Sequence, residues 1–146
     1  MGIVANLVAQ RIVSTNSEGF RADAYDDATG QPIKAVGVVT IGYGCACRDW
    51  SKAFAYDVML LQLNQFEQPL LQEPWYMNCN AARRSALLEI AFNQGDASLI
   101  NGYPKMIAAI KAQNWPEARA QCTVNDPRLA ARYAMLGNIL LTGELP

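Results

Sequence analysis

Three short stretches decide the fold that the sequence predicts: residues 17–21 (Ser-Glu-Gly-Phe-Arg), 25–27 (Tyr-Asp-Asp) and 40–44 (Thr-Ile-Gly-Tyr-Gly). A glycine follows Glu18 directly, so the backbone can turn sharply there. Asp27 follows Glu18 after nine residues. Two carboxylates in different environments can act as a general acid and as the activator of a water molecule. Spacing alone leaves an alternative open, in which Glu18 ends a surface helix and the aspartates are turn residues.

The composition excludes several classes of function. The chain has 146 residues, of which 51% are hydrophobic, enough for one domain with a real core. Its net charge of −1 gives no electrostatic argument for binding nucleic acid, which usually needs a basic face. There is no histidine, which removes Ser/His and Cys/His catalysis and histidine-based metal sites. An acid or base acting near neutral pH must then be a carboxylate, a cysteine or a lysine.

The spacing of the four cysteines does not indicate a metal site or a cofactor. Cys45 and Cys47 are close neighbours, and Cys79 and Cys122 stand far from them, with no Cys-x-x-Cys spacing anywhere. We expect reduced structural cysteines. A zinc site and a single disulfide formed after release from the cell are the alternatives.

The pattern of the chain predicts an α+β fold. We expect a helix over residues 2–13, interpreted as neither a secretory signal nor a membrane span. A small antiparallel β lobe is expected over residues 20–48, with a β-branched strand at 36–41. Helices should fill residues 51–143, so that 1–17 and 51–143 form the helical part of a single domain over 1–146.

Four features shape the expected helical part. Ser51 should cap a helix in which Phe54, Val58, Leu61 and Gln65 fall on one face, with Leu60 and Leu63 beside it. Pro69 and Pro74 should interrupt it. Residues 81–93 are almost wholly apolar in their second half, which predicts a central, buried helix ending at Gly95. Shorter helices are expected at 103–110, after Asn114, and from Asp126-Pro127 to Leu141, with Gly143 beyond.

In this order the motifs resemble those of the phage-type lysozymes, glycoside hydrolase family 24. The Glu-Gly start at Glu18, the acid nine residues later and the Thr-Ile-Gly-Tyr-Gly turn match the active-site segment of that family. Residues 83–95, ending Phe-Asn-Gln-Gly, resemble its buried central helix, and residues 111–118 its Trp-x-Glu-Ala helix start. Residues 126–143 resemble its final helix. The resemblance implies a lysozyme-like fold with an active-site cleft between the β lobe and the helices.

The resemblance also implies roles for single residues. Glu18 would be the general acid, Asp27 would hold or activate the attacking water, and Thr40 would orient that water. Asp26 is a rival to Asp27, but only Asp27 has the nine-residue spacing of the family.

Gly44 and Asn93 fall where the family lines its substrate cleft. An alternative for Asn93 is that it only satisfies backbone groups at the end of its helix. The implied reaction is hydrolysis of the β-1,4 bond between N-acetylmuramic acid and N-acetylglucosamine, with inversion and without a cofactor or metal.

The chain departs from the family pattern in places. Cys45 stands where a histidine usually follows the turn, and the loop over residues 30–40 is longer than the family hairpin. The family also places an arginine of the last helix near the acidic pair, and Arg128 and Arg132 are both candidates. The near-neutral charge provides no strong attraction to an anionic wall.

We therefore expect an endolysin, monomeric, without stable membrane insertion, that folds in the host cytoplasm and reaches peptidoglycan in the periplasm through a holin. The alternatives are an antibacterial effector with the same domain and a non-catalytic wall-binding module of lysozyme fold. Intact Glu18, Asp27 and Thr40 argue against the last one, because a buried acid costs stability.

Overall fold

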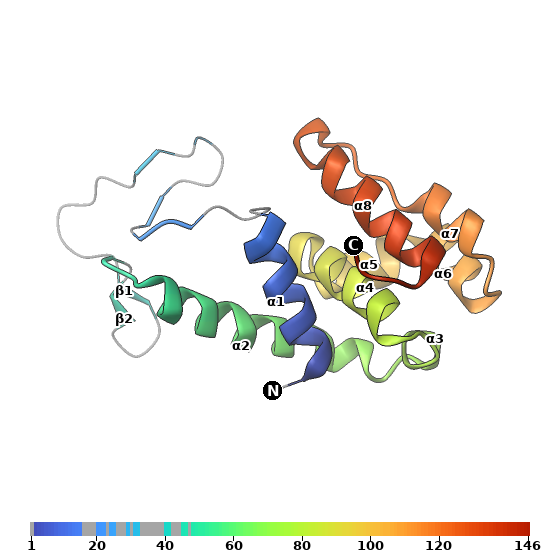
Figure 1. Ribbon diagram of the computed structural model, residues 1–146, viewed down its shortest axis with the longest axis horizontal. Helices are drawn as coiled ribbons and strands as arrows, with labels where there is room; N and C mark the ends of the chain where they lie inside the picture. Colours follow the sequence, from blue (N-terminus) through green and yellow to red (C-terminus); the bar gives the residue numbers. More distant parts are fainter. Residues whose placement is uncertain are drawn as a thin grey trace.

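The computed structural model describes residues 2–15, 20–22, 24, 25, 29, 31, 32, 40, 41, 45, 46 and 48–146, with the backbone alone at 40, 41, 45 and 96–98. This part of the chain is mainly helical (Figure 1). Its helices are α1 (Ile3–Thr15), α2 (Lys52–Leu70), α3 (Pro74–Met77), α4 (Ala81–Gln94), α5 (Asp96–Gly102), α6 (Pro104–Lys111), α7 (Trp115–Gln121), a 3-10 turn η1 (Pro127–Leu129) and α8 (Ala130–Thr142).

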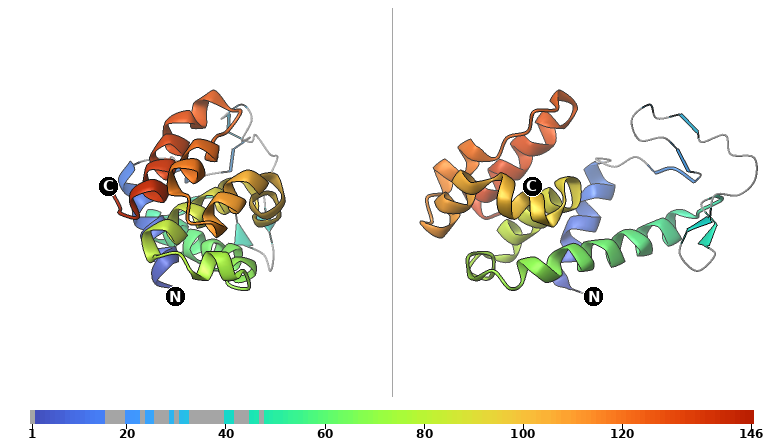
Figure 2. Two further views of the ribbon diagram at one scale, coloured as in Figure 1. Left: turned by 90° about the vertical axis from the view of Figure 1, so that its right-hand side faces the viewer. Right: turned by 180° about the vertical axis from the view of Figure 1, so that it is seen from behind.

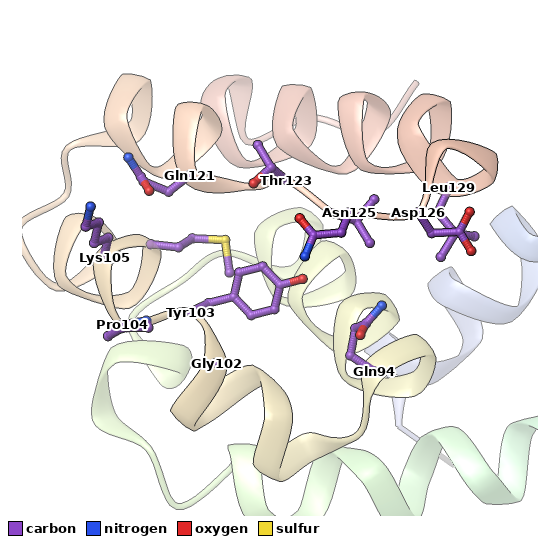
Figure 3. Close-up of a pocket in the computed structure, with 12 residues that line it drawn as sticks. Gln94, Gly102, Tyr103, Pro104, Lys105, Gln121, Thr123, Asn125, Asp126 and Leu129 are labelled. Atoms are coloured by element: carbon purple, nitrogen blue, oxygen red, sulfur yellow. The ribbon is translucent and has the colours of Figure 1, made fainter.

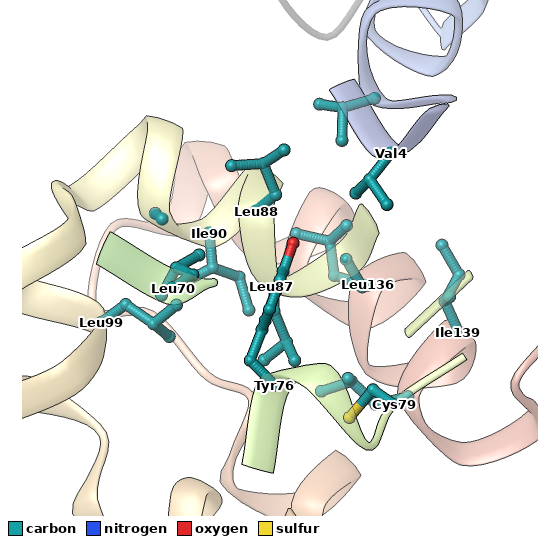
Figure 4. Close-up of a cluster of buried hydrophobic side chains, with 14 of the residues drawn as sticks. Val4, Leu70, Tyr76, Cys79, Leu87, Leu88, Ile90, Leu99, Leu136 and Ile139 are labelled. Carbon is teal, nitrogen blue, oxygen red and sulfur yellow. The ribbon is translucent and has the colours of Figure 1, made fainter. Parts of the chain in front are cut away.

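Helix α4 is the centre of the core. Helices α1, α2, α5 and α8 all pack against it, and the views of Figure 2 show it surrounded by them. Every residue from 85 to 91 is buried, as expected for a helix covered on all sides. Figure 4 shows Leu87, Leu88 and Ile90 of this helix together with Leu70, Leu99, Leu136 and Tyr76 from its neighbours. The predicted central helix over residues 81–93 is confirmed.

The helix ends follow the predicted capping residues. Ser51 and Asn114 each accept a hydrogen bond from the backbone N–H three residues later, which satisfies a donor that the first turn leaves open. Gly95 ends α4 with φ of 91°, and Gly143 ends α8 with φ of 74°, in the left-handed region. Asp126 caps the turn that leads into α8. Local chemistry thus sets where these helices begin and end.

Two predictions about α2 are wrong. The buried residues are Leu60, Leu63, Glu67 and Leu70, whereas Phe54 and Leu61 are exposed. The start of α2 extends beyond the other helices toward the strand pair (Figure 1), and there Phe54 packs edge-on against Trp50 rather than on the core. Pro69 lies inside the helix, one residue before its end, so the bond and the contact that a proline disturbs fall in the last turn and only one helical residue follows. Pro74 begins α3 instead.

The strand structure among the described residues is small. Strands β1 (Thr40–Ile41) and β2 (Cys45–Ala46) pair antiparallel, with Thr40 opposite Ala46. Tyr25 and Pro32 form a single antiparallel bridge. Most of the β lobe predicted over residues 20–48 lies outside the described residues, and strands of two residues are too short to make a lobe. The described residues therefore show a mainly helical fold and do not show the predicted β lobe.

Helix α5, which the sequence pattern did not reveal, joins the core helix to α6. It begins directly after Gly95, so that a single glycine separates two helices. Among the helices described here, none is long and apolar enough to cross a membrane.

The end of α8 packs closely on the start of α4. The Arg83 side chain donates from Nε to the Leu140 carbonyl (2.9 Å), and its guanidinium lies 3.8 Å from the centre of the Trp115 ring. Asn80 Nδ2 donates to the Gly143 carbonyl (2.9 Å). A Cβ on Gly143 would lie 2.9 Å from Arg83 Cζ, so the Arg83 side chain would have to shift, but the positive φ is what requires a glycine here.

We expect Gly143→Ala to lower the free energy of unfolding by about 1–3 kcal/mol, because alanine is strained at this φ. Urea unfolding monitored by circular dichroism measures this change. Gly102→Ala is the matched control: nothing lies within 4 Å of its added Cβ, and the expected change is about zero or a small gain. Equal losses in the two variants would contradict this account.

Candidate active site

The structure describes only part of the predicted site. Glu18, Asp26, Asp27 and Gly44 lie outside the described residues. Thr40 is placed through its backbone in β1, at the far end of α2 from the helical core (Figure 1). Asn93 lies in the last turn of α4. The geometry of the site is therefore described from the helical side: the end of α1, the end of α4 and the pocket beside it.

Helix α1 ends at Thr15, three residues before Glu18. Ser14 Oγ and Thr15 Oγ1 both donate to the carbonyl of Arg11, at 3.1 and 2.8 Å. These bonds hold the last turn of the helix to Arg11. The position of Arg11 therefore determines where the chain leaves α1 toward Glu18.

Arg11 belongs to a buried ion cluster that also contains Ser85, Glu89 and Arg132. Arg11 Nε donates to Glu89 Oε2 at 2.7 Å, and Nη2 lies 2.6 Å from the same oxygen. Arg11 also donates to Ser85, from Nη1 to Oγ (2.9 Å) and from Nη2 to the carbonyl (3.0 Å). Arg132 Nε lies 3.8 Å from Glu89 Oε1. The cluster joins α1, α4 and α8.

The cluster distinguishes the two arginines that the sequence left open. Arg128 is exposed and forms an ion pair with Asp126 (2.7 Å), two residues away. Its hydrogen bonds hold the pKa of Asp126 below the ordinary value. The Arg132 side chain is only 6% exposed and faces Glu89. Of the two, Arg132 is the arginine that the last helix directs into the helical core, next to the partner of Arg11.

Asn93 is bound by side chains rather than by backbone groups. Its Oδ1 accepts hydrogen bonds from Tyr133 Oη (3.3 Å) and from Gln94 Nε2 (2.9 Å). Burial, followed by a hydrogen bond with Tyr103, raises the pKa of Tyr133 above its ordinary value, so this hydroxyl stays protonated near neutral pH. The described bonds of the Asn93 side chain do not support the alternative in which it only satisfies the end of its helix.

A polar pocket opens next to Asn93, between the end of α4, the start of α6 and the segment from α7 to η1. Its volume is about 780 Å³. In Figure 3 the Tyr103 ring lies in the middle of the lining residues, with its hydroxyl directed to the side where Gln94 and Asn125 lie. Among the other lining residues, Lys105, Gln121, Thr123 and Asp126 carry hydrogen-bonding groups, whereas Pro104, Met106, Val124 and Leu129 are apolar. Such a lining suits a ligand rich in hydroxyl and amide groups.

Sequence reasoning missed both the cluster and the pocket. A signal for the cluster was present: Ser85, Glu89 and Asn93 recur every four residues in the otherwise apolar stretch 85–93. Residues at this spacing lie on one face, so they form a polar stripe on α4. The pocket had a weaker signal, the run of polar residues at 121–126 between two helices.

Two cysteines are described with their side chains, and both are free thiols. Cys79 and Cys122 are buried, and their Sγ atoms approach the carbonyls of Trp75 (3.4 Å) and Tyr133 (3.7 Å). Burial raises the pKa of Cys79 and raises that of Cys122 to about 12. The prediction of reduced structural cysteines is confirmed for these two. Among the residues described, no three carboxylates or thiols gather where a metal ion could bind.

These features define a mainly helical protein with a pocket at the end of α4 and a buried ion cluster earlier in the same helix. The family model described as "Phage lysozyme" matches residues 15–127, which is well over half of the chain. The chain belongs to the phage lysozyme family. No protein in a search of curated proteins matches it. Family membership confirms the resemblance found in the sequence motifs and supports a glycosidase that acts on peptidoglycan.

The buried thiols provide a test of the core around α8. In a Cys45→Ser/Cys47→Ser variant at pH 8, we expect the folded protein to react with a disulfide reagent at least about 100-fold more slowly than the protein in urea. A pKa near 12 leaves Cys122 with about a thousandth of the thiolate of an ordinary cysteine, and burial blocks access as well. Rapid labelling of both thiols in the folded protein would contradict the packing described here.

Proposed function

We propose that this protein is an endolysin-type muramidase, which hydrolyses the β-1,4 bond between N-acetylmuramic acid and N-acetylglucosamine in bacterial peptidoglycan and so lyses the cell. The family match over residues 15–127 carries this proposal, because that range contains Glu18, Asp27, Thr40, Gly44 and Asn93. The polar pocket beside Asn93 supports it as well, since sugars and peptides are rich in hydrogen-bonding groups.

In the proposed mechanism Glu18 is the general acid and protonates the leaving oxygen of the glycosidic bond. Asp27 stays ionised and activates a water molecule, which Thr40 orients through its hydroxyl. Water attacks from the opposite face of the sugar and inverts the configuration at the anomeric carbon. A pair of carboxylates with room for a water molecule between them favours this inversion. These roles need a positioned acid, a positioned base and water.

Gly44 and Asn93 are proposed to contact the substrate. The bonds from Tyr133 and Gln94 leave the Asn93 amide nitrogen as the group that can donate to a sugar or peptide carbonyl. The adjoining pocket then offers space for the part of peptidoglycan that extends past Asn93.

The proposal includes a biological setting. The protein acts as a monomeric lysozyme-like domain over residues 1–146, folds in the host cytoplasm and reaches the wall in the periplasm through a holin. An antibacterial effector with the same domain would share the chemistry and differ only in its delivery.

We expect wild-type protein to clear permeabilised Gram-negative cells and to release reducing ends from purified peptidoglycan. Glu18→Gln should lower the rate by about 10²-fold or more, because the amide cannot donate the proton. Glu144→Gln, which changes an exposed carboxylate near the C-terminus, should keep the wild-type rate. A folded wild type without activity would indicate a non-catalytic wall-binding module, and an active Glu18→Gln would remove Glu18 from the mechanism.

The two neighbouring aspartates form a second matched pair. Asp27→Asn should lower the rate by about 10²-fold or more, because an amide is a poor base for activating water, whereas Asp26→Asn should retain most of the rate. Initial rates of reducing-end release from the same peptidoglycan measure both. The reverse result would transfer the role of Asp27 to Asp26.

A further inference from the structure

The buried ion cluster is not accounted for by the proposed chemistry. The side chains of Arg11, Glu89 and Arg132 are 5%, 0% and 6% exposed. Removing charges from water costs much of what their attraction gains, and well-packed apolar residues are often as stable in such places. Three charged residues in the core of a small domain therefore call for an explanation besides stability.

The bonding inside the cluster is directional. Arg11 uses Glu89 Oε2 and the two oxygens of Ser85, so three of its nitrogens have fixed partners. Glu89 Oε1 accepts no hydrogen bond from the described residues, and Arg132 faces it at 3.8 Å. One carboxylate thus lies between two guanidinium groups, one from α1 and one from α8.

The cluster connects the parts of the candidate site. Through Arg11, whose carbonyl receives the hydroxyls of Ser14 and Thr15, it holds the last turn of α1. Glu89 lies one helical turn before Asn93 on the polar stripe of α4. Arg132 directly precedes Tyr133, which donates to Asn93.

We propose that Glu89 is a positioning residue, which holds the end of α1, and with it the approach to Glu18, at a set place relative to Asn93 and the pocket. This inference rests on the proposed function for its effect on the reaction. Its structural part, the tie between Glu89 and the last turn of α1, stands on the contacts alone. A displacement of about 1 Å between an acid and its substrate can cost about 100-fold in rate.

The test uses Arg11→Met/Glu89→Gln, which removes the buried charge pair while a glutamine oxygen still faces Arg132. We expect kcat on purified peptidoglycan to fall about 10- to 100-fold while KM changes less than about twofold. Hydrogen exchange of the amides of residues 12–15 should become faster, while exchange in α8 stays as in the wild type.

A milder variant and a control accompany it. Ser85→Ala removes one partner of Arg11 and keeps all charges, so a smaller fall in kcat with faster exchange at residues 12–15 is expected. Glu67→Gln changes the other glutamate that is buried among the described residues; it accepts a hydrogen bond from Tyr76 and has no described bond to the end of α1. This variant should have a lower unfolding temperature than the wild type. Its kcat, measured well below that temperature, should equal the wild-type kcat.

The outcomes separate the two proposals. A folded double variant with wild-type kcat, or with unchanged exchange at residues 12–15, would overturn the positioning role and leave the muramidase proposal intact. If the double variant does not fold, the same two measurements on Ser85→Ala, kcat and exchange at residues 12–15, decide whether the positioning role holds. A wild type that releases no reducing ends would sink the muramidase proposal, and exchange at residues 12–15 would then decide the structural tie on its own.

Discussion

The rest of the described structure depends on the ion pair between Arg11 and Glu89, which joins residues 78 positions apart. Once these charges have left water, a packing of α1 that separated them would leave an uncompensated charge in the core, at a cost of about 3–5 kcal/mol. The bonds to Ser85 add a second restraint in a different direction. Apolar contacts alone would tolerate small shifts of α1 along α4, whereas hydrogen bonds to a buried carboxylate tolerate almost none. The pair thus defines the place of α1 in the bundle.

Helix α4 combines two roles on one element. Leu87, Leu88 and Ile90 contribute to the apolar core, and the polar stripe of Ser85, Glu89 and Asn93 runs along another face. The stripe begins at the bonds to Arg11, deep in the core, and ends at the half-buried Asn93 beside the pocket. An active site built on such a helix inherits its rigidity, because α4 is packed on all sides and cannot move independently of its neighbours.

The C-terminal part of the chain provides the other wall of the pocket and closes the fold. Helix α8 faces Glu89 through Arg132 and Asn93 through Tyr133, while its end packs on Arg83 and Asn80. The same helix therefore serves both stability and the candidate site. Arg128 and Arg132 are only four residues apart but have opposite environments: Arg128 lies in the 3-10 turn η1, exposed and paired with Asp126, whereas Arg132 lies in α8 and faces Glu89 of α4.

The sequence by itself determined the family, the capping residues at Ser51, Asn114, Gly95 and Gly143, and the buried central helix, because each depends on chemistry within a few residues or on one periodic pattern. Glu18, Asp27 and Thr40 were found in the same way and stay predictions. Only the tertiary structure decided which face of α2 is buried, which arginine enters the core and where the pocket lies. Those features depend on contacts between segments far apart in the chain, and no local pattern encodes which of two possible faces meets a neighbour.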